Sequence, residues 1–484
     1  MTKVCPHKKP LDPMSSHLSS SGSPQSEHPF EITSKPSHVH LVGIGGTGMS
    51  ALAQLLADRT ITVSGSDRVL DRGAETPVLS RLRRRGVRLY PQDGSGVHPD
   101  TSAVVISTAI EADNPDILAA RERGIPIVHR TRMLVHVMGR APCIAVAGTS
   151  GKTTVTGMIG WILTCAGVDP TVVNGGAVLN WVGEDNIGHA RHGSDAVWVV
   201  EADESDRSLL AFQPEWAVLT NISADHFNFD ESLDLFVQFA ERVRTGLVCT
   251  PETARWLSRR AAASTVRKLI ETKSGIEERN GTWRIPCGNS QMACPLPGRH
   301  NAENGLLAVT LCEALGHDAE AVGEALAGFR GIERRLQKLG SAGGITVIDD
   351  YAHNPAKIRA AWETARTMGR RVVGVWRPHG YVPLAMMAGN LEETLQDIMR
   401  NDILYVLDVY YAGGTAKREI EAEAFADRLI KRGLNITYLP DYEALEAELK
   451  AEVEPGDVVL FMGARDPGLP AFARRYADCV AGRR

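Results

Sequence analysis

The segment Cys143-Ile-Ala-Val-Ala-Gly-Thr-Ser-Gly-Lys-Thr-Thr154 constrains the fold more than any other part of the chain. Its apolar run 144–147 predicts a buried parallel strand, and a helical pattern begins at Lys152. Glycines at such a junction let successive backbone N–H groups point inward at the positive end of the helix. Lys152 would contact the outer phosphates of a nucleotide, and the hydroxyl of Thr153 would bind Mg²⁺. Val146 stands where the general pattern has its first glycine, so a plain helix start remains an alternative at this point.

Composition is that of an ordinary globular enzyme, and 484 residues are enough for about two to four domains. Hydrophobic residues make up 43% of the chain, and the net charge of -5 gives no bias towards nucleic acid or an anionic membrane. The eight cysteines are irregularly spaced, without a C-x-x-C pair, which predicts reduced thiols and a cytoplasmic protein. No apolar run approaches the roughly 18 residues of a membrane span. Residues 1–36 lack the apolar core of a signal peptide, and we expect a disordered tail.

The first folded segment has the layout of a dinucleotide-binding unit. A strand over 38–44 runs into Gly43-Ile-Gly-Gly-Thr-Gly48, a helix follows to about residue 57, and a second strand ends at Asp67. In this layout the glycines admit a pyrophosphate to the helix N-terminus. A tight strand-to-helix turn without a ligand is the alternative. Further apolar strands over 103–110 and 125–129 predict a doubly wound α/β domain.

Acidic and polar residues follow two strands of the next unit. The apolar run 196–200 leads into Glu201-Ala-Asp-Glu-Ser-Asp206, where carboxylates beside a phosphate loop would bind Mg²⁺. A solvated acidic loop is equally compatible with these residues alone. The run 216–222 is also a predicted strand and ends near His226, for which a structural and a ligand role are both open.

Residues 247–295 are less regular and predict short antiparallel strands, and a long amphipathic helix is predicted after them. Pro297-Gly-Arg-His-Asn-Ala-Glu-Asn304 opens it, and its two asparagines would either cap the helix or hydrogen-bond an adenine edge. By spacing alone we favour capping. After a linker at 331–336, strands over 345–348, 371–376, 403–409 and 457–462 predict a third α/β unit.

Together these motifs resemble the Mur ligases, the ATP-dependent amide-forming enzymes of peptidoglycan synthesis. The segments that carry the resemblance occur in family order over roughly residues 38–468: Val42–Met49, Val63–Asp67, Gly148–Thr154, Asp169–Gly176, Glu201–Asp206, Thr220–His226, Pro297–Asn301, Arg334–Arg335 and Asp349–His353. The resemblance implies a Rossmann-like UDP-binding domain (37–140), a central P-loop ATPase-like domain with a mostly parallel sheet (141–328) and a Rossmann-like C-terminal ligase domain (329–484).

The resemblance also implies an activity. The expected enzyme joins L-alanine to the carboxylate of UDP-N-acetylmuramate through an acyl phosphate, with ATP and Mg²⁺. Such a protein would be a cytoplasmic monomer or homodimer without nucleic-acid or membrane partners.

Site residues follow from the resemblance by motif position. The expected catalytic residues are Lys152, His226, Arg335 and His353. The expected ATP contacts are Gly148, Thr149, Gly151, Lys152, Thr153, Thr154, Asn301, Asn304, Arg335 and Asp350, with the asparagines at adenine, Asp350 at ribose and Arg335 at the γ-phosphate. The expected metal ligands are Thr153, Glu201 and His226. The expected sugar-nucleotide contacts are Gly43, Gly45, Gly46, Gly48, Met49, Asp67, Ser107, Asn174 and Gly175.

Several positions depart from the pattern of the alanine-adding members. Ser150 and Asn354 stand where histidines are usual, Arg377-Pro-His-Gly380 replaces Gln-Pro-His-Arg, and Gly414 replaces a glutamate. A related ligase that adds another amino acid or a peptide is therefore one alternative. A non-catalytic nucleotide-binding homologue and an NAD-dependent oxidoreductase are the others.

Overall fold

The computed structural model describes residues 36–223, 227–260, 268–411 and 420–482. The predicted tail (apart from Pro36), His226 and Gly414 lie outside these ranges. The seven described cysteines are all free, in agreement with reduced thiols. Among the described helices, none combines the length and the apolar character that a membrane crossing requires.

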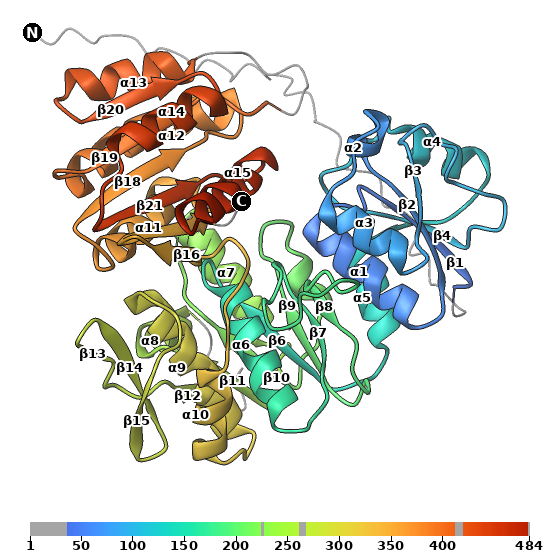
Figure 1. Ribbon diagram of the computed structural model, residues 1–484. Coiled ribbons are helices and arrows are strands. Elements are labelled where there is room, and N and C mark those ends of the chain that lie inside the picture. The colour runs from blue at the N-terminus through green and yellow to red at the C-terminus, as the bar shows by residue number, and fades with distance from the viewer. Residues whose placement is uncertain (1–35, 224–226, 261–267, 412–419, 483–484) are drawn as a thin grey trace, which may run out of the picture. The chain divides into compact units, whose positions relative to one another are not determined.

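The first sheet is five-stranded and parallel, in the order β3-β2-β1-β4-β5 (Figure 1). Its central strand β1 (His38–Val42) is fully buried, as expected where helices cover both faces of a parallel sheet. The other strands are β2 (Thr62–Ser66), β3 (Arg88–Tyr90), β4 (Ala103–Ile106) and β5 (Ile127–His129). The helices are α1 (Thr47–Asp58), α2 (Arg68–Asp71), α3 (Pro77–Arg84), α4 (Pro115–Glu122) and α5 (Arg130–Met138).

The second sheet has seven strands in the order β12-β11-β10-β6-β9-β7-β8, all parallel except the β7–β8 pair. The strands are β6 (Cys143–Ala147), β7 (Thr171–Val173), β8 (Ala190–Arg191), β9 (Trp198–Glu201), β10 (Trp216–Leu219), β11 (Gly246–Cys249) and β12 (Leu269–Glu271). Helices α6 (Lys152–Cys165) and α9 (Arg299–Ala314) pack together in the core beside this sheet. The remaining elements are the 3₁₀ helix η1 (Ser208–Ala211), α7 (Phe229–Ala240), α8 (Pro251–Arg260) and α10 (Ala319–Ala327).

The region 247–295 differs from the expected set of short antiparallel strands. Its first part contributes β11, α8 and β12 to the central parallel unit. Only its last part is antiparallel, as a separate three-stranded sheet of β13 (Glu277–Arg279), β14 (Thr282–Cys287) and β15 (Ser290–Ala293). The short apolar runs of β11 and β12 were too brief to separate parallel from antiparallel pairing by pattern alone.

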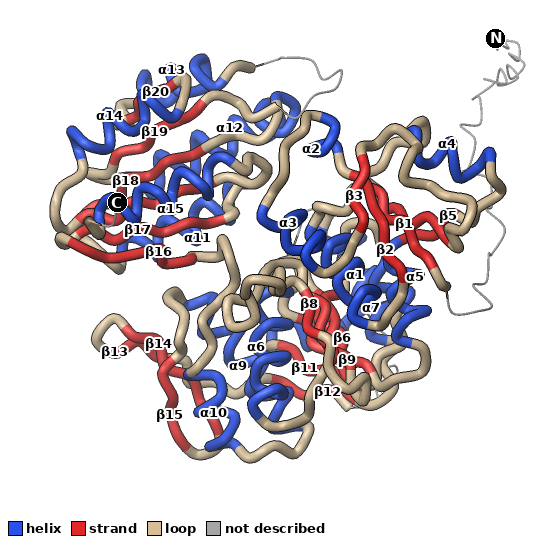
Figure 2. Tube along the Cα trace, turned by 45° about the vertical axis from the view of Figure 1, so that its right-hand side comes forward, coloured by secondary structure: helices blue, strands red, loops and turns tan. Residues whose placement is uncertain are grey.

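The third sheet has six strands in the order β16-β17-β21-β18-β19-β20, with only β16 antiparallel (Figure 2). Alternate residues of β18 enter two cores, Val372 on one face and Val373 on the other, so helices cover both faces. The strands are β16 (Gln337–Ala342), β17 (Ile345–Asp350), β18 (Arg371–Trp376), β19 (Ile403–Leu407), β20 (Ile436–Leu439) and β21 (Asp457–Met462). The helices are α11 (Pro355–Arg366), α12 (Tyr381–Ile398), α13 (Ala422–Lys431), α14 (Tyr442–Glu452) and α15 (Gly468–Val480).

The predicted fold class is confirmed: three α/β units, each built on a mostly parallel sheet. In such sheets, loops at the carboxyl ends of the strands form the ligand sites. The predicted phosphate loop, acidic segment and glycine loop all occupy such ends.

Candidate active site

The phosphate loop connects the carboxyl end of β6 to the N-terminus of α6. Gly148 (φ 128°) and Gly151 (φ 86°) have backbone conformations that favour glycine. A side chain at Gly148 would collide with the hydroxyl of Thr220, and one at Gly151 with the amide of Asn304. Both glycines are therefore required by conformation and by space.

Hydrogen bonds fix this loop to the segment after β10. The backbone N–H groups of Thr149 and Ser150 donate to Asn221, at 3.1 Å to its carbonyl and 3.0 Å to its side-chain oxygen. The Thr220 hydroxyl donates to the Ser150 carbonyl at 2.6 Å. No side chain in the described ranges caps the N-terminus of α6, so its first N–H groups are available to an anion.

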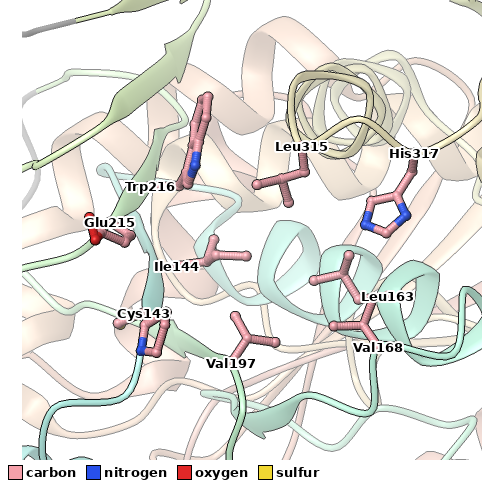
Figure 3. A pocket seen from close by; sticks show the side chains of 10 residues that line it. Cys143, Ile144, Leu163, Val168, Val197, Glu215, Trp216, Leu315 and His317 are labelled. Carbon is pink, nitrogen blue, oxygen red and sulfur yellow. The ribbon is translucent and has the colours of Figure 1, made fainter.

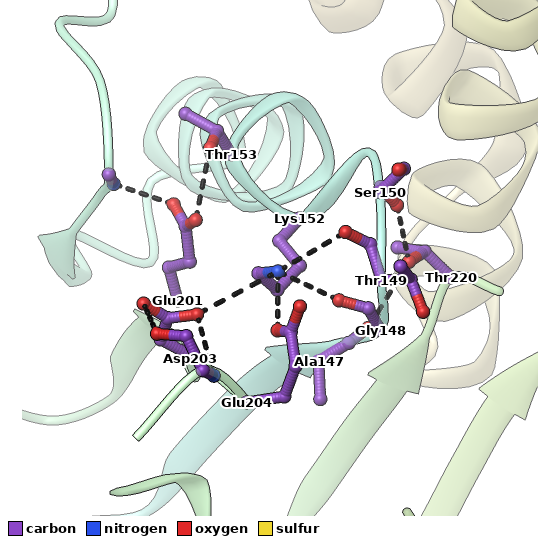
Figure 4. Close-up of polar contacts among 12 residues, drawn as sticks. Ala147, Gly148, Thr149, Ser150, Lys152, Thr153, Glu201, Asp203, Glu204 and Thr220 are labelled. Atoms are coloured by element: carbon purple, nitrogen blue, oxygen red, sulfur yellow. Dashed lines mark hydrogen bonds and ion pairs between the residues drawn. The ribbon is translucent and has the colours of Figure 1, made fainter. Parts of the chain in front are cut away.

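Lys152 bends back over the loop (Figure 4). Its Nζ donates to the Gly148 carbonyl at 2.8 Å and to Oε2 of Glu204 at 2.5 Å. Sequence reasoning placed Glu204 only within a run of four acids and gave it no individual role. Its place three residues after the end of β9 does not separate it from the other acids of the run, whereas its burial does.

Thr153 and Glu201 lie together beside the loop. The Thr153 hydroxyl donates to Oε1 of Glu201 at 3.0 Å, and the Gly175 N–H donates to Oε2 at 2.6 Å. Oδ1 of the neighbouring Asn174 is buried and has no hydrogen-bond partner among the described residues. A hydroxyl and a carboxylate are hard oxygen ligands, and Mg²⁺ commonly takes one or two protein ligands together with water and phosphate oxygens. The residues therefore fit Mg²⁺, while the described ranges contain no cluster of three or more His, Cys, Asp or Glu side chains suited to a metal.

A cleft of about 770 Å³ brings most of the predicted nucleotide residues together. Its lining includes Thr149, Gly151, Lys152, Thr153, Thr154, Glu201, Glu204, Asn301, Asn304, Arg335 and Asp350. His353 is not part of this lining. These residues come from the phosphate loop and the start of α6, from the end of β9, from helix α9 and from the segment around β17, which are far apart in the sequence.

The two asparagines of α9 do not cap the helix, so the capping interpretation was wrong. The N-cap residue is Gly298, and no side chain in the described ranges accepts a hydrogen bond there. Asn301 instead donates from Nδ2 to the Pro297 carbonyl at 2.7 Å. Gly298 has a φ of 91°, a conformation that favours glycine. It occupies the N-cap position, so the helix begins before either asparagine. Both asparagines line the cleft.

Asp350, at the end of β17, is held by backbone donors. It accepts from the Leu336 N–H at 2.6 Å and from the Ala352 N–H at 2.7 Å. Burial raises its pKa, against the opposing charge of Arg335. The Arg335 guanidinium lies 5.4 Å from the centre of the Tyr351 ring, which orients it at the cleft wall.

His353 forms a neutral pair with a second histidine. Its Nδ1 lies 2.9 Å from the Tyr351 carbonyl, which only accepts, so Nδ1 carries the hydrogen. Burial lowers the pKa of His353 to about 4. Its ring meets that of His379 edge-to-face with centroids 4.9 Å apart. His353 is therefore an uncharged side chain next to the cleft.

The glycine loop after β1 is the predicted sugar-nucleotide site. Asp67 accepts from the Gly45 N–H at 2.9 Å and also caps α2 through the Val69 N–H, so it shapes the loop. A side chain at Gly48 would collide with the guanidinium of Arg130. Sequence reasoning missed this arginine, although it directly follows strand β5 in the same sheet. Its positive charge at the N-terminus of α1 suits a diphosphate.

Most other predicted sugar-nucleotide residues surround these positions. Gly43 has a φ of 73° and Gly46 is the N-cap of α1, while Met49 is buried in its first turn. Ser107 follows the end of β4 and accepts through its carbonyl from the Ile110 N–H.

His189 links α1 to the Asn174 segment. The Ser50 hydroxyl donates its single hydrogen to the Thr47 carbonyl, so His189 Nδ1, 2.9 Å away, must be the donor to Ser50. The His189 carbonyl in turn accepts from the Asn174 N–H at 2.9 Å. One buried histidine therefore bridges the glycine-loop helix and the residues beside Glu201.

His189 is expected to make the free energy of unfolding depend on pH in the acidic range. Burial lowers the pKa of His189 from 6.5 to about 4, so between these values the unfolded chain binds a proton that the folded chain does not. The free energy of unfolding must then fall as pH falls through that window. We expect His189→Gln to reduce this fall by up to about 3 kcal/mol, measured by urea unfolding at several pH values. Identical pH dependence in both proteins would contradict the assignment.

A second cavity, of about 310 Å³, lies at the opposite ends of the central strands (Figure 3). It is lined by Pro142, Cys143, Ile144, Leu163, Val168, Val197, Glu215, Trp216, Leu315 and His317. These residues include the first residues of β6 and β10, whereas the phosphate loop follows the last residue of β6. None of the predicted site residues lines this cavity.

Comparisons with known proteins agree with this architecture. Three family models match: the Mur ligase family catalytic domain over residues 38–141, the Mur ligase middle domain over 146–244, and the Mur ligase glutamate ligase domain over 334–465. A UDP-N-acetylmuramate–L-alanine ligase of Cyanothece sp. is 35% identical, over 88% of this chain and 92% of that protein. One of Mycolicibacterium vanbaalenii is 36% identical, over 91% and 96%.

Solved structures give the same result. The UDP-N-acetylmuramate–alanine ligase of Thermotoga maritima has a TM-score of 0.76 and 27% identity, covering 92% of this chain and all of that one. A murein peptide ligase of Psychrobacter arcticus shares the fold, with a TM-score of 0.66 at 21% identity, over 93% and 99% of the two chains. Sequence identity of this extent over nearly the whole length shows common descent, and the chain belongs to the Mur ligase family.

Proposed function

We propose that this protein is an ATP-dependent ligase that joins L-alanine to the carboxylate of UDP-N-acetylmuramate in the cytoplasm, as a step of peptidoglycan precursor synthesis. The observation that carries the proposal is the convergence of Lys152, Thr153 and Glu201 at the phosphate loop. The relatives named above, which carry this activity in their names, support the choice of substrates. The boundaries 37–140, 141–328 and 329–484 are our proposed domain limits.

ATP would occupy the cleft with its phosphates at the N-terminus of α6. The N–H groups of the first turn and the Lys152 ammonium supply positive charge for the β- and γ-phosphates. Asn301 and Asn304 offer both donors and acceptors to an adenine edge. Asp350, already held by two backbone N–H groups, would accept from the ribose.

Thr153 and Glu201 would hold Mg²⁺, which neutralises the charge between the triphosphate and an approaching carboxylate. His226, expected as a further ligand, lies outside the described residues. Arg335, which also lines the cleft, would add positive charge.

The reaction has two steps. An oxygen of the muramoyl carboxylate attacks the γ-phosphorus, forming an acyl phosphate and releasing ADP. The uncharged amine of alanine then attacks the acyl carbon, the tetrahedral intermediate expels phosphate, and a proton leaves the new amide nitrogen. The first step brings two negative groups together and the second develops negative charge on the tetrahedral intermediate, and Lys152 and Arg335 would stabilise that charge. The uncharged His353, three residues after the cleft residue Asp350, would assist in orienting the acceptor.

The sugar nucleotide would bind with its diphosphate at Gly43, Gly45, Gly46 and Gly48, where Arg130 adds a cation. Asn174 and Gly175 would approach its reacting end, because Gly175 also contacts Glu201. The glycine loop therefore serves a uridine diphosphate, and family membership leaves the oxidoreductase interpretation without support.

A second candidate function is a ligase of the same chemistry that uses a different amino acid or a peptide as acceptor. Arg377 stands in place of the usual glutamine and pairs with Asp466 at 2.8 Å, with its Nε buried and unpartnered among the described residues. A guanidinium placed here could bind the carboxylate of a different amino acid or of a peptide.

The deciding experiment measures phosphate release from ATP and UDP-N-acetylmuramate with single amino acids and with L-Ala-γ-D-Glu-diaminopimelate. We expect release to require L-alanine. Release only with another acceptor would keep the chemistry and change the substrate. No release with any acceptor, despite ATP binding, would favour a non-catalytic homologue.

A further inference from the structure

The phosphate-loop lysine is already bound to a buried carboxylate. Glu204 is only 3% exposed, and its Oε2 lies 2.5 Å from Lys152 Nζ (Figure 4). Its Oε1 is buried and finds no hydrogen-bond partner in the described parts of the chain. Lys152 is therefore the counter-ion of this buried carboxylate.

The same ammonium already directs its three hydrogens at protein oxygens, so none is left for a phosphate. Its three donors reach the Gly148 carbonyl at 2.8 Å, the Thr149 carbonyl at 3.5 Å and Glu204. Glu204 also lines the cleft beside Lys152 and Glu201. A triphosphate in the cleft must compete with Glu204 for Lys152 and would approach its negative charge.

We propose that Glu204 is an internal competitor for the phosphate-loop lysine: nucleotide displaces it from Lys152, and the displaced carboxyl group takes up a proton. This proposal rests on ATP binding as proposed above. It makes Glu204 a positioning residue that holds Lys152 before ATP binds and loses its charge when ATP binds.

The charges around Glu204 determine the direction of proton movement. Burial raises the pKa of Glu204, Lys152 lowers it and the adjacent Asp203 raises it. When Lys152 turns to the phosphates, the ammonium that lowers this pKa through its charge and its hydrogen bond is withdrawn, and further negative charge arrives. The pKa of Glu204 must rise, so ATP binding takes up a proton. ATP affinity then weakens as pH increases from the pKa of Glu204 in the free protein to its higher pKa in the ATP complex.

The test is calorimetric titration of the full-length protein with ATP near neutral pH, in buffers of different ionisation enthalpy and with excess Mg²⁺ so that the triphosphate is fully ionised. We expect the wild type to take up a fraction of a proton approaching one per ATP. Glu204→Gln keeps the shape and removes the titrating group, so we expect no uptake, a flat dependence of affinity on pH, and about tenfold tighter binding, the order of one charge-assisted hydrogen bond.

Asp203→Asn is the matched control. Its carboxylate lies 4.0 Å from Lys152 Nζ and its side chain is 41% exposed, so water can solvate it after ATP binds. We expect this variant to retain the proton uptake, with a change in affinity below about threefold. Unfolding temperatures of both variants establish that the fold is kept.

Three results would overturn the proposal. Equal proton uptake in the wild type and in Glu204→Gln would show that Glu204 does not titrate. Weaker ATP binding by a folded Glu204→Gln would show that Glu204 helps Lys152 rather than competing for it. A wild type that does not bind ATP would overturn the proposed function itself, and this inference with it.

Discussion

Replacing Lys152 by alanine is expected to lower the rate of alanine-dependent phosphate release by about 100- to 1,000-fold, the loss seen when one preorganised electrostatic contact to a transition state is removed. The reason is that the ammonium approaches the outer phosphates at the point where negative charge must be neutralised. A steady-state assay with UDP-N-acetylmuramate, ATP and L-alanine measures this directly.

The fold should survive this change. Lys152 is at the first position of α6, its contacts are to loop carbonyls and to Glu204, and the buried residues of the helix are untouched. Glu204 loses its counter-ion and is expected to become protonated, which avoids a buried unpaired charge. Lys268→Ala is the matched control, because Lys268 is an exposed lysine directly before β12 that lies 5.8 Å from the Trp216 ring centre. Unchanged turnover in Lys152→Ala would overturn the phosphate-loop assignment.

Much of this site could be predicted because it follows from local sequence. A buried strand, two glycines with positive φ and a helix beginning at Lys152 occupy adjacent positions, so the loop was visible without tertiary information. The pairing of Thr153 with Glu201 was implied by the family resemblance, and the structure brings the two side chains into contact because the parallel strands β6 and β9 end at one edge of the sheet.

The remaining features depend on contacts that pattern does not encode. The sequence alone does not show which of the four acids in the run 201–206 pairs with Lys152. Only the packing shows that Glu204 is the buried one. Asn301 was misread as a cap because the positive φ of Gly298, which sets where α9 begins, has no sequence signature beyond the glycine itself. Arg130 begins helix α5 directly after β5 and reaches the glycine loop from a position far along the chain.

Glu201→Gln should abolish most of the phosphate release, for a reason different from that given for Lys152→Ala. In the wild type, both oxygens of Glu201 accept hydrogen bonds, from the Thr153 hydroxyl and the Gly175 N–H. A glutamine has one oxygen, so its amide must face one of these donors, and it brings no negative charge to Mg²⁺. We expect at least about a 100-fold loss of phosphate release, because the metal contributes several kcal/mol of charge stabilisation.

The dependence on Mg²⁺ separates a ligand role from a structural one. If Glu201 holds the metal, Glu201→Gln requires more Mg²⁺ for half-maximal activity, and raising Mg²⁺ restores part of the rate. Glu271→Gln is the control, since Glu271 is an exposed acid that ends strand β12 of the same sheet and lies outside the cleft lining. A loss of activity in Glu201→Gln with an unchanged Mg²⁺ requirement would mean that Glu201 acts by fixing Thr153 and Gly175. The carboxylate would then support the loop geometry, and the metal would have to be held by other oxygens around the triphosphate.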